Sequence, residues 1–233
     1  MKPYYQNNKV TLYCADCRDV LPGIEADVVI TDPPYGVGVE YNIYKDTRQN
    51  LKKLINDVWP LLLQTPLVAA TTGVMNMFLY PKPLWSLCWF SAAGIGMGPW
   101  GFCTWQPILV WGKDPYLAAG KGSMPDGFSY MSSVEKNDHP VPKPAEVMRW
   151  IIKRTTLKPC TILDPFAGSG VTLTEAQALG HKAIGIELDE KYCELIANRL
   201  ERGPVGAPID GMRHSKRCRY PILPCICEKL KRA

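Results

Sequence analysis

Short apolar runs alternate with amphipathic stretches along the first 200 residues of the chain. Runs rich in β-branched residues predict buried strands at 12–16, 27–30, 66–72, 84–90, 107–111, 160–163 and 182–187. Apolar side chains three and four residues apart predict helices at 45–64, 144–155, 171–179 and 190–200. Because strands and helices alternate, we expect an α/β fold with a doubly wound, mostly parallel sheet.

The polar positions divide the chain into a body and a tail. Residues 1–202 are enough for one domain with a substantial core. Within them, the Gly-rich stretch 92–98 predicts a flexible loop, and 113–142 predicts a long surface excursion. Residues 199–233 carry nine Lys and Arg against three Asp and Glu, more than the whole net charge of +5. We therefore predict that 203–233 is a basic tail that can engage phosphates.

Two loops that follow predicted strands carry most of the candidate chemistry. Residues 31–36 read Thr-Asp-Pro-Pro-Tyr-Gly, and residues 164–170 read Asp-Pro-Phe-Ala-Gly-Ser-Gly. Parallel strands end at the same end of a sheet, where open α/β sheets bind ligands. Gly168 and Gly170 allow close backbone approach, and Glu187, after the next strand, can accept hydrogen bonds from ribose hydroxyls. The spacing fits neither a triphosphate P-loop nor the dinucleotide Gly-x-Gly-x-x-Gly pattern.

In this order the two loops resemble those of the amino-methylating DNA methyltransferases, which act on N6 of adenine or N4 of cytosine. The resemblance covers about residues 10–202 and is to the β arrangement, in which the catalytic motif precedes the cofactor motif. It implies the Rossmann-like fold of S-adenosylmethionine-dependent methyltransferases, in circularly permuted motif order. It also implies S-adenosylmethionine as cofactor, with Phe166 beside the methionine part and Glu187 on the ribose.

The resemblance assigns further residues to the cofactor. Ala15-Asp16-Cys17 matches a family motif whose acid faces the adenine amino group, although the family has Gly where Ala15 stands. His139-Pro140-x-x-Lys143-Pro144 resembles the motif that lines the same pocket from the preceding helix. The implied cofactor-binding residues are Asp16, His139, Lys143, Asp164, Pro165, Phe166, Gly168, Ser169, Gly170 and Glu187.

The implied catalytic segment is Asp32, Pro33, Pro34 and Tyr35. Two consecutive prolines hold the backbone rigid, so that the Asp32 carboxylate and the Pro33 carbonyl can accept both hydrogens of an exocyclic amine. The freed lone pair attacks the sulfonium methyl directly, while Tyr35 offers a flat face for the base. The base must leave the duplex to reach this segment. Asp at position 32 is associated in the family with N6-adenine, and N4-cytosine is the alternative.

Double-stranded DNA is the implied partner. Target recognition is expected from 112–138, together with the loop 92–101. This span is short, so we expect a short or relaxed target, or contacts from the tail or from a second subunit of a homodimer. Five tryptophans between positions 85 and 111 indicate core or dimer-interface packing, with support of base flipping as the alternative.

Other classes are disfavoured by particular features. Apolar runs stay short of membrane-spanning length and the first residues are too polar for a signal peptide. We therefore expect a cytoplasmic protein, prokaryotic or phage-encoded, in a restriction–modification setting. The nine scattered cysteines are interpreted as free thiols and no metal is expected, although Cys14 and Cys17 have the spacing of half a zinc site.

Four further functions are weighed as alternatives. Cytosine-C5 methylation needs an activated cysteine beside proline, and neither Pro159-Cys160 nor Pro224-Cys225 stands in a catalytic setting. Methylation of RNA adenine would use the same scaffold, whereas protein glutamine methylation is disfavoured by the motif order. A non-catalytic DNA-binding relative is disfavoured because Asp32, Tyr35 and Asp164 are intact.

Overall fold

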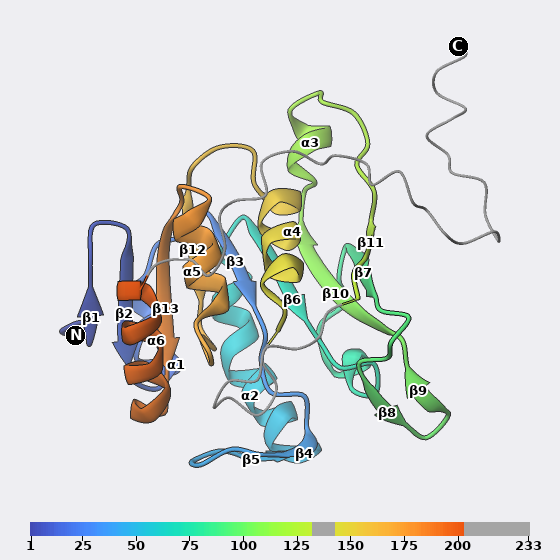
Figure 1. Ribbon diagram of the computed structural model, residues 1–233, viewed down its shortest axis with the longest axis horizontal. Helices are drawn as coiled ribbons and strands as arrows, with labels where there is room; N and C mark the ends of the chain where they lie inside the picture. The colour runs from blue at the N-terminus through green and yellow to red at the C-terminus, as the bar shows by residue number, and fades with distance from the viewer. Residues whose placement is uncertain (132–142, 203–233) are drawn as a thin grey trace.

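The computed structural model describes residues 1–131 and 143–202. Within these ranges nine strands form one sheet in the order β1-β2-β13-β12-β3-β6-β10-β7-β11 (Figure 1). The strands are β1 (Tyr5–Gln6), β2 (Val10–Cys14), β3 (Val28–Thr31), β6 (Leu67–Thr71), β7 (Trp85–Phe90), β10 (Trp105–Gly112), β11 (Gly127–Ser129), β12 (Thr161–Asp164) and β13 (Lys182–Glu187). From β2 to β6 all neighbours are parallel, whereas β10 is antiparallel to β6 and β7. The prediction of a mostly parallel sheet is confirmed.

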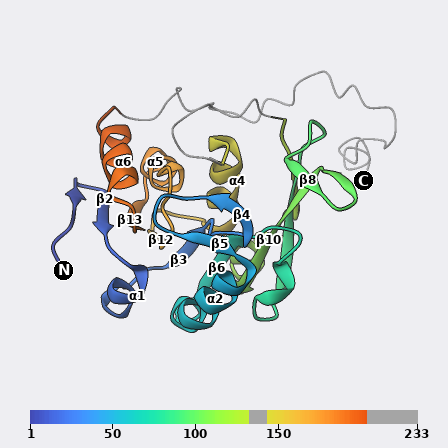
Figure 2. The same cartoon turned by 90° about the horizontal axis from the view of Figure 1, so that it is seen from below.

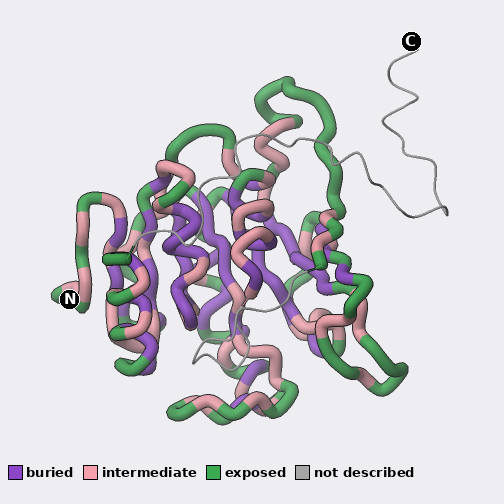
Figure 3. The backbone as a smooth tube through the Cα atoms, viewed as in Figure 1, coloured by how far each residue is buried: buried purple, intermediate pink, exposed green. Residues whose placement is uncertain are grey.

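Helices cover both faces of this sheet, as a doubly wound fold requires. One face carries α4 (Ala145–Thr155), α5 (Val171–Ala178) and α6 (Glu190–Arg202), and the other carries α1 (Cys17–Val20) and α2 (Arg48–Leu62) (Figure 2). Val28 and Ile30 of β3 join the core under α4–α6, while Val29 joins the core under α1 and α2. Burial therefore concentrates in the central strands (Figure 3). Burial on both faces explains why these strands read as unbroken apolar runs.

The parallel strands give the sheet a carboxyl end and an amino end. Ile108, near the start of β10, pairs with Thr71 at the finish of β6, so β10 begins at the carboxyl end. Two hairpins also lie at that end: β4 (Val37–Glu40) with β5 (Lys45–Thr47), and β8 (Gly96–Gly98) with β9 (Gly101–Cys103) (Figures 1 and 2). The helix α3 (Pro115–Ala118) follows β10 and lies at the amino end (Figure 1). Short 3₁₀ turns occupy η1 (Leu21–Gly23) and η2 (Met77–Leu79).

Two sequence-based expectations need correction. The helix expected at 45–64 begins only at Arg48, because 45–47 form β5 and the Thr47 side chain caps the helix by accepting from Asn50 N at 3.2 Å. The flexible loop expected at 92–98 is wrong, because residues 96–98 pair with 101–103. Ser91 N donates to Thr104 O at 2.8 Å and Ile95 N to Cys103 O at 2.7 Å. Backbone pairing thus orders a segment without the apolar alternation that predicts a strand.

The excursion expected at 113–142 contains regular structure where it is described. It holds α3 and then β11, which pairs in parallel with β7 at the edge of the sheet. Residues 132–142 and the expected basic tail at 203–233 lie outside the described residues. None of the helices described here has the length and apolar character to cross a membrane.

Candidate active site

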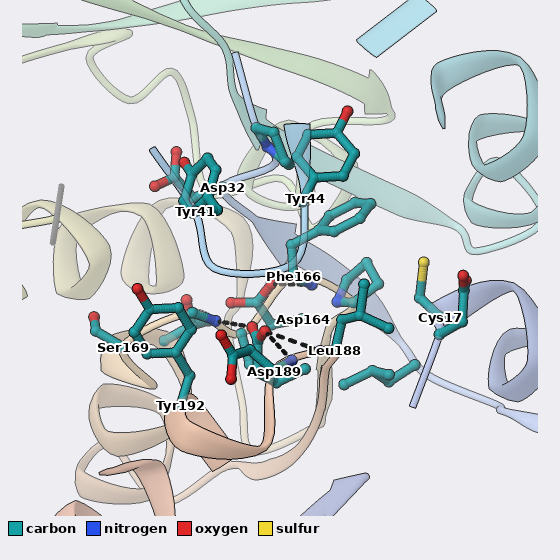
Figure 4. Close-up of a pocket in the computed structure, with 18 of the residues that line it drawn as sticks. Cys17, Asp32, Tyr41, Tyr44, Asp164, Phe166, Ser169, Leu188, Asp189 and Tyr192 are labelled. Atoms are coloured by element: carbon teal, nitrogen blue, oxygen red, sulfur yellow. Dashed lines mark hydrogen bonds between the residues drawn. The ribbon is translucent and has the colours of Figure 1, made fainter. Parts of the chain in front are cut away.

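The two predicted loops meet because the strands that precede them, β3 and β12, are neighbours. Thr31 Oγ1, at the end of β3, donates to Asp164 Oδ1, at the end of β12, over 2.6 Å. Asp32 and Gly168 consequently line the same pocket. Figure 4 shows Asp32 on one side of this pocket, with Asp164 and Phe166 nearer its centre. Two segments that are far apart in sequence thus form one site.

Side chains from three separate segments hold the Asp32 carboxylate. Its Oδ1 accepts from Thr71 Oγ1, at the end of β6, at 2.5 Å and from the Tyr35 hydroxyl at 2.6 Å. Its Oδ2 lies 2.9 Å from Nζ of Lys143, just before α4. The Lys143 side chain is 7% exposed and the Asp32 side chain 22%, so solvent screens this ion pair only weakly. The carboxylate is therefore fixed with both oxygens engaged.

Tyr35 is held by its hydroxyl, its ring and its carbonyl. The hydroxyl donates to Asp32 and accepts from Gln106 Nε2 at the start of β10. Lys143 Nζ lies 4.8 Å from the ring centroid, and Asn76 Nδ2 donates to the Tyr35 carbonyl at 2.8 Å. Burial raises the pKa of Tyr35 well above its usual value, so the hydroxyl stays protonated. These contacts fix the orientation of the Tyr35 ring.

Asp164 links the loop that follows β3 to the loop that follows β12. It is buried, and besides the Thr31 hydroxyl it accepts Phe166 N at 3.1 Å, which fixes the first turn of the loop. Burial raises the pKa of Asp164 to about 6, against the opposing effect of hydrogen bonds from Thr31 and Thr172. At neutral pH Asp164 is ionised, and burying the charged carboxylate lowers the stability of the folded protein.

The two glycines of the cofactor loop serve different purposes. Gly168 and Gly170 have φ of +53° and +75°, which favours glycine at both. Gly168 lines the pocket, as expected. At Gly170 an added Cβ would lie 2.9 Å from Ile196 Cγ1, so α6 packs where a side chain would stand. Packing against Ile196 thus explains why glycine stands at position 170, and the role of Gly170 toward a ligand stays a prediction.

Backbone donors hold Glu187 at the end of β13. Its Oε2 accepts Gly168 N at 2.8 Å, and its Oε1 accepts Leu188 N and Asp189 N, both at 2.9 Å. Burial raises the pKa of Glu187, and these backbone hydrogen bonds act in the opposite direction. Glu187 also lines the pocket, and its predicted role toward ribose hydroxyls stays a prediction.

Asp16 lines the far wall of the pocket and caps α1. Its Oδ1 accepts Arg18 N at 2.9 Å, and its Oδ2 lies 2.5 Å from the Arg18 guanidinium. The Arg18 side chain, through this hydrogen bond, lowers the pKa of Asp16. Asp16 thus stays ionised, with Arg18 as its present partner.

A hairpin that sequence reasoning missed covers the pocket. Tyr41 and Tyr44, between β4 and β5, line it, and Asn42 Nδ2 reaches across to Asp189 Oδ2 at 2.8 Å. The hairpin is anchored at its base by the Asp46 carboxylate, which accepts the backbone N–H groups of residues 36–39 at 2.6–3.1 Å. Because these hydrogen bonds to Asp46 order the segment, it needs no periodic pattern of apolar side chains.

The other predicted residues are placed as follows. Pro34, Pro165, Phe166 and Ser169 line the pocket, whereas Pro33 is buried behind it. His139 lies outside the described residues. Lys143, implied to serve the cofactor, lines the pocket and contacts Asp32 and Tyr35, the residues predicted to be catalytic. Among the described residues no group of His, Cys, Asp and Glu could hold a metal ion.

Comparison with known proteins defines the class. Residues 44–199 match the N6 and N4 methylase family, described as DNA methylase, and this span is well over half of the 233 residues. The chain therefore belongs to the N6/N4 DNA methylase family. The type II methyltransferase M.ScaI of Streptomyces caespitosus is 24% identical over 259 residues, which cover 86% of this chain and 84% of that protein.

Solved structures support the fold assignment. M1.HpyAVI in complex with SAM has a TM-score of 0.58 at 21% identity, covering 82% of this chain and 98% of that chain. The PvuII DNA methyltransferase, described as cytosine-N4-specific, has a TM-score of 0.61 at 16% identity, covering 87% and 96%. The expected methyltransferase fold is confirmed, and β3, which precedes the predicted catalytic segment, comes before β12, which precedes the predicted cofactor loop.

Proposed function

We propose that this protein transfers a methyl group from S-adenosylmethionine to an exocyclic amine of a DNA base, and that the amine is N6 of adenine. The Thr31–Asp164 hydrogen bond carries the proposal, because it joins the Asp32 carboxylate and the 164–170 loop in one pocket. Membership of the DNA methylase family supplies the class of substrate.

The pocket residues suit S-adenosylmethionine in type. Glu187 offers a carboxylate, held by three backbone N–H groups, that can accept ribose hydroxyls. Ile43 and Leu188 offer apolar surface for the adenine ring, and Phe166 offers apolar surface beside the methionine part. Bound there, S-adenosylmethionine supplies a methyl group on a positively charged sulfur, and the amine nitrogen bonds to its carbon as the carbon–sulfur bond breaks.

Asp32 orients the accepting amine. Its carboxylate accepts one hydrogen and the Pro33 carbonyl accepts the other, which frees the nitrogen lone pair. The carboxylate then stabilises the positive charge that develops on nitrogen and offers an acceptor for the proton that leaves. Thr71 and Tyr35 already occupy Oδ1, so the amine takes Oδ2.

Lys143 holds that oxygen in the substrate-free protein. Its ammonium donates to Asp32 Oδ2 at 2.9 Å and lies over the Tyr35 ring, where an incoming base would stack. An ammonium and a nitrogen that gains positive charge repel each other at this distance. We therefore expect the Lys143 side chain to move aside as the base enters.

The choice of N6 of adenine rests on the Asp at position 32 and its resemblance to the adenine form of the motif. N4 of cytosine is the second candidate, because the PvuII enzyme described as specific for it shares this fold. Both amines present two hydrogens to the same pair of acceptors, so the geometry of Asp32 suits either base.

A labelled-methyl assay tests the proposal. The full chain is incubated with methyl-labelled S-adenosylmethionine and duplex DNA of mixed sequence, and the DNA is digested for nucleoside chromatography. We expect label in N6-methyladenine, and a loss of at least about 10³-fold for Asp32→Ala, which removes the charge that stabilises the transition state. Asp19→Ala, at an exposed carboxylate on α1, is the matched control and should keep full activity.

Other outcomes would change the assignment. Label in N4-methylcytosine would favour the second candidate. If the protein binds DNA and S-adenosylmethionine without transferring methyl, and Asp32→Ala behaves as wild type, it is a non-catalytic relative.

A further inference from the structure

The β8–β9 hairpin carries the most exposed aromatic side chain among the described residues. Trp100, in its turn, is 102% exposed, and Met97 and Phe102 beside it are 72% and 78% exposed. Of the five tryptophans expected to pack in a core or an interface, Trp89 and Trp111 are buried in the core. Trp100 is instead held out in solvent by an ordered hairpin.

The hairpin lies at the same end of the sheet as the catalytic segment (Figures 1 and 2). It leaves β7 at Phe90 and returns into β10 at Trp105, and these two residues pair with each other. The next residue of β10, Gln106, donates to the hydroxyl of Tyr35. A short, hydrogen-bonded path therefore links the hairpin to the segment that would receive the base.

The chemistry of the hairpin suits the inside of a duplex better than its backbone. Residues 91–112 contain no Asp, Glu, Lys or Arg, so the hairpin offers no cation to a phosphate. Proteins that unstack DNA insert apolar or aromatic side chains between base steps. Four glycines, at 94, 96, 98 and 101, keep the hairpin thin, so Trp100 stands at a narrow tip and not on a flat face that a dimer would bury.

We propose that Trp100 inserts between base steps beside the target base and so lowers the free energy needed to flip that base toward Asp32. The inference rests on the proposed function, since it concerns the duplex that the active site would methylate. Sequence reasoning considered the hairpin together with the excursion 112–138 for recognition. Within the described part of that excursion α3 lies at the amino end of the sheet, whereas β11 runs back to the carboxyl end, where Ser129 pairs with Phe90 at the start of the hairpin.

Two duplexes and three variants test the inference. In one duplex the target base is paired, and in the other it faces an abasic site, so that little unpairing is needed. We expect Trp100→Ala to lower kcat/KM about tenfold or more on the paired duplex and less than about twofold on the unpaired one. Trp100→Phe should restore most of the activity, because a flat ring remains.

Trp85→Ala is the matched control. Trp85 is 61% exposed and lies on the same sheet, but at the start of β7 and therefore at the amino end. It should leave both duplexes unaffected. An equal loss on both duplexes for Trp100→Ala would overturn the inference, as would a change in sedimentation that shows a dimer contact. No transfer by the wild type to either duplex would contradict the proposed function itself.

Discussion

Asp32 and Glu187 are both carboxylates on the wall of one pocket, but the protein holds them in different ways. Glu187 is held by three backbone N–H groups, all within residues 168–189. Asp32 is held by the side chains of Thr71, Tyr35 and Lys143, which come from β6, the catalytic loop and the segment before α4. Glu187 is thus held by backbone groups, and Asp32 by side chains, two of which come from distant segments.

This difference has consequences for substitution and for motion. Backbone donors stay in place when neighbouring side chains change, so the cofactor side should tolerate variation around Glu187. Side-chain donors can move, and one of them, Lys143, occupies the oxygen that the substrate needs. The Asp32 carboxylate is therefore held in a fixed orientation, while the substrate can replace Lys143 at its Oδ2.

Beyond Asp32→Ala, the largest effect is expected from Glu187→Gln, which should weaken cofactor binding. Gln would turn an amide N–H₂ toward at least one backbone N–H that now donates to the carboxylate. We expect S-adenosylmethionine to bind about 100-fold more weakly by isothermal titration calorimetry. Glu190→Gln, at an exposed acid at the start of α6, is the control. An unchanged affinity would show that backbone donors do not define this side of the pocket.

The next effect concerns pH and the buried link between the two sides. The pKa of Asp164 is raised to about 6, so between about pH 4 and 6 the unfolded chain loses its proton before the native state does. Native stability therefore falls as pH rises through this window, and the full loss is present above it. Asp164→Asn removes the titrating carboxyl group and therefore this loss of stability, while the amide oxygen can still accept from Thr31.

We expect the stability of Asp164→Asn relative to the wild type to increase by about 3 kcal/mol between pH 4 and pH 7 in denaturant unfolding. The exposed Glu25→Gln should show no such pH-dependent gain. A difference between Asp164→Asn and wild type that is the same at pH 4 and pH 7 would contradict the assignment of burial as the cause.

A smaller effect is expected from Thr71→Val, which removes one donor to Asp32 without changing shape. We expect kcat to fall about tenfold with unchanged cofactor affinity, because one hydrogen bond to a charged group is lost. Thr72→Val is the matched control, since the Thr72 hydroxyl is buried and has no hydrogen-bond partner among the described residues. Equal losses for the two variants would mean that Thr71 acts only through packing.

An effect of similar size is expected from Tyr35→Phe. It keeps the ring but removes the hydroxyl that donates to the charged Asp32 carboxylate and accepts from Gln106, so a drop of about tenfold in methyl transfer is expected. Tyr35→Ala, which also removes the stacking face, should lose much more. A loss by Tyr35→Phe as large as that of Asp32→Ala would give the hydroxyl a direct part in the chemistry.

The same contrast explains how much of the site the sequence predicts. The cofactor loop and Glu187 lie on one strand–loop–helix–strand segment, so a local pattern is enough to place them. Asp32 is found by its motif, and Thr71 could have been found as a polar residue at the end of a predicted strand. Gln106 could not, because it comes from an antiparallel strand and carries no motif. The β4–β5 and β8–β9 hairpins were missed because backbone hydrogen bonds order them without apolar periodicity.

The order of strands in the sheet also bears on how the nascent chain matures. β12 and β13, synthesised late, lie between β2 and β3, synthesised early. Until Glu187 has left the ribosome, β2 and β3 lack their central neighbours and expose unpaired backbone. Residues 31–36 are therefore synthesised long before Asp164, the hydrogen-bond partner of Thr31. Because the chain is made from its N-terminus, we expect no methyl transfer until β13, the last strand, has joined the sheet.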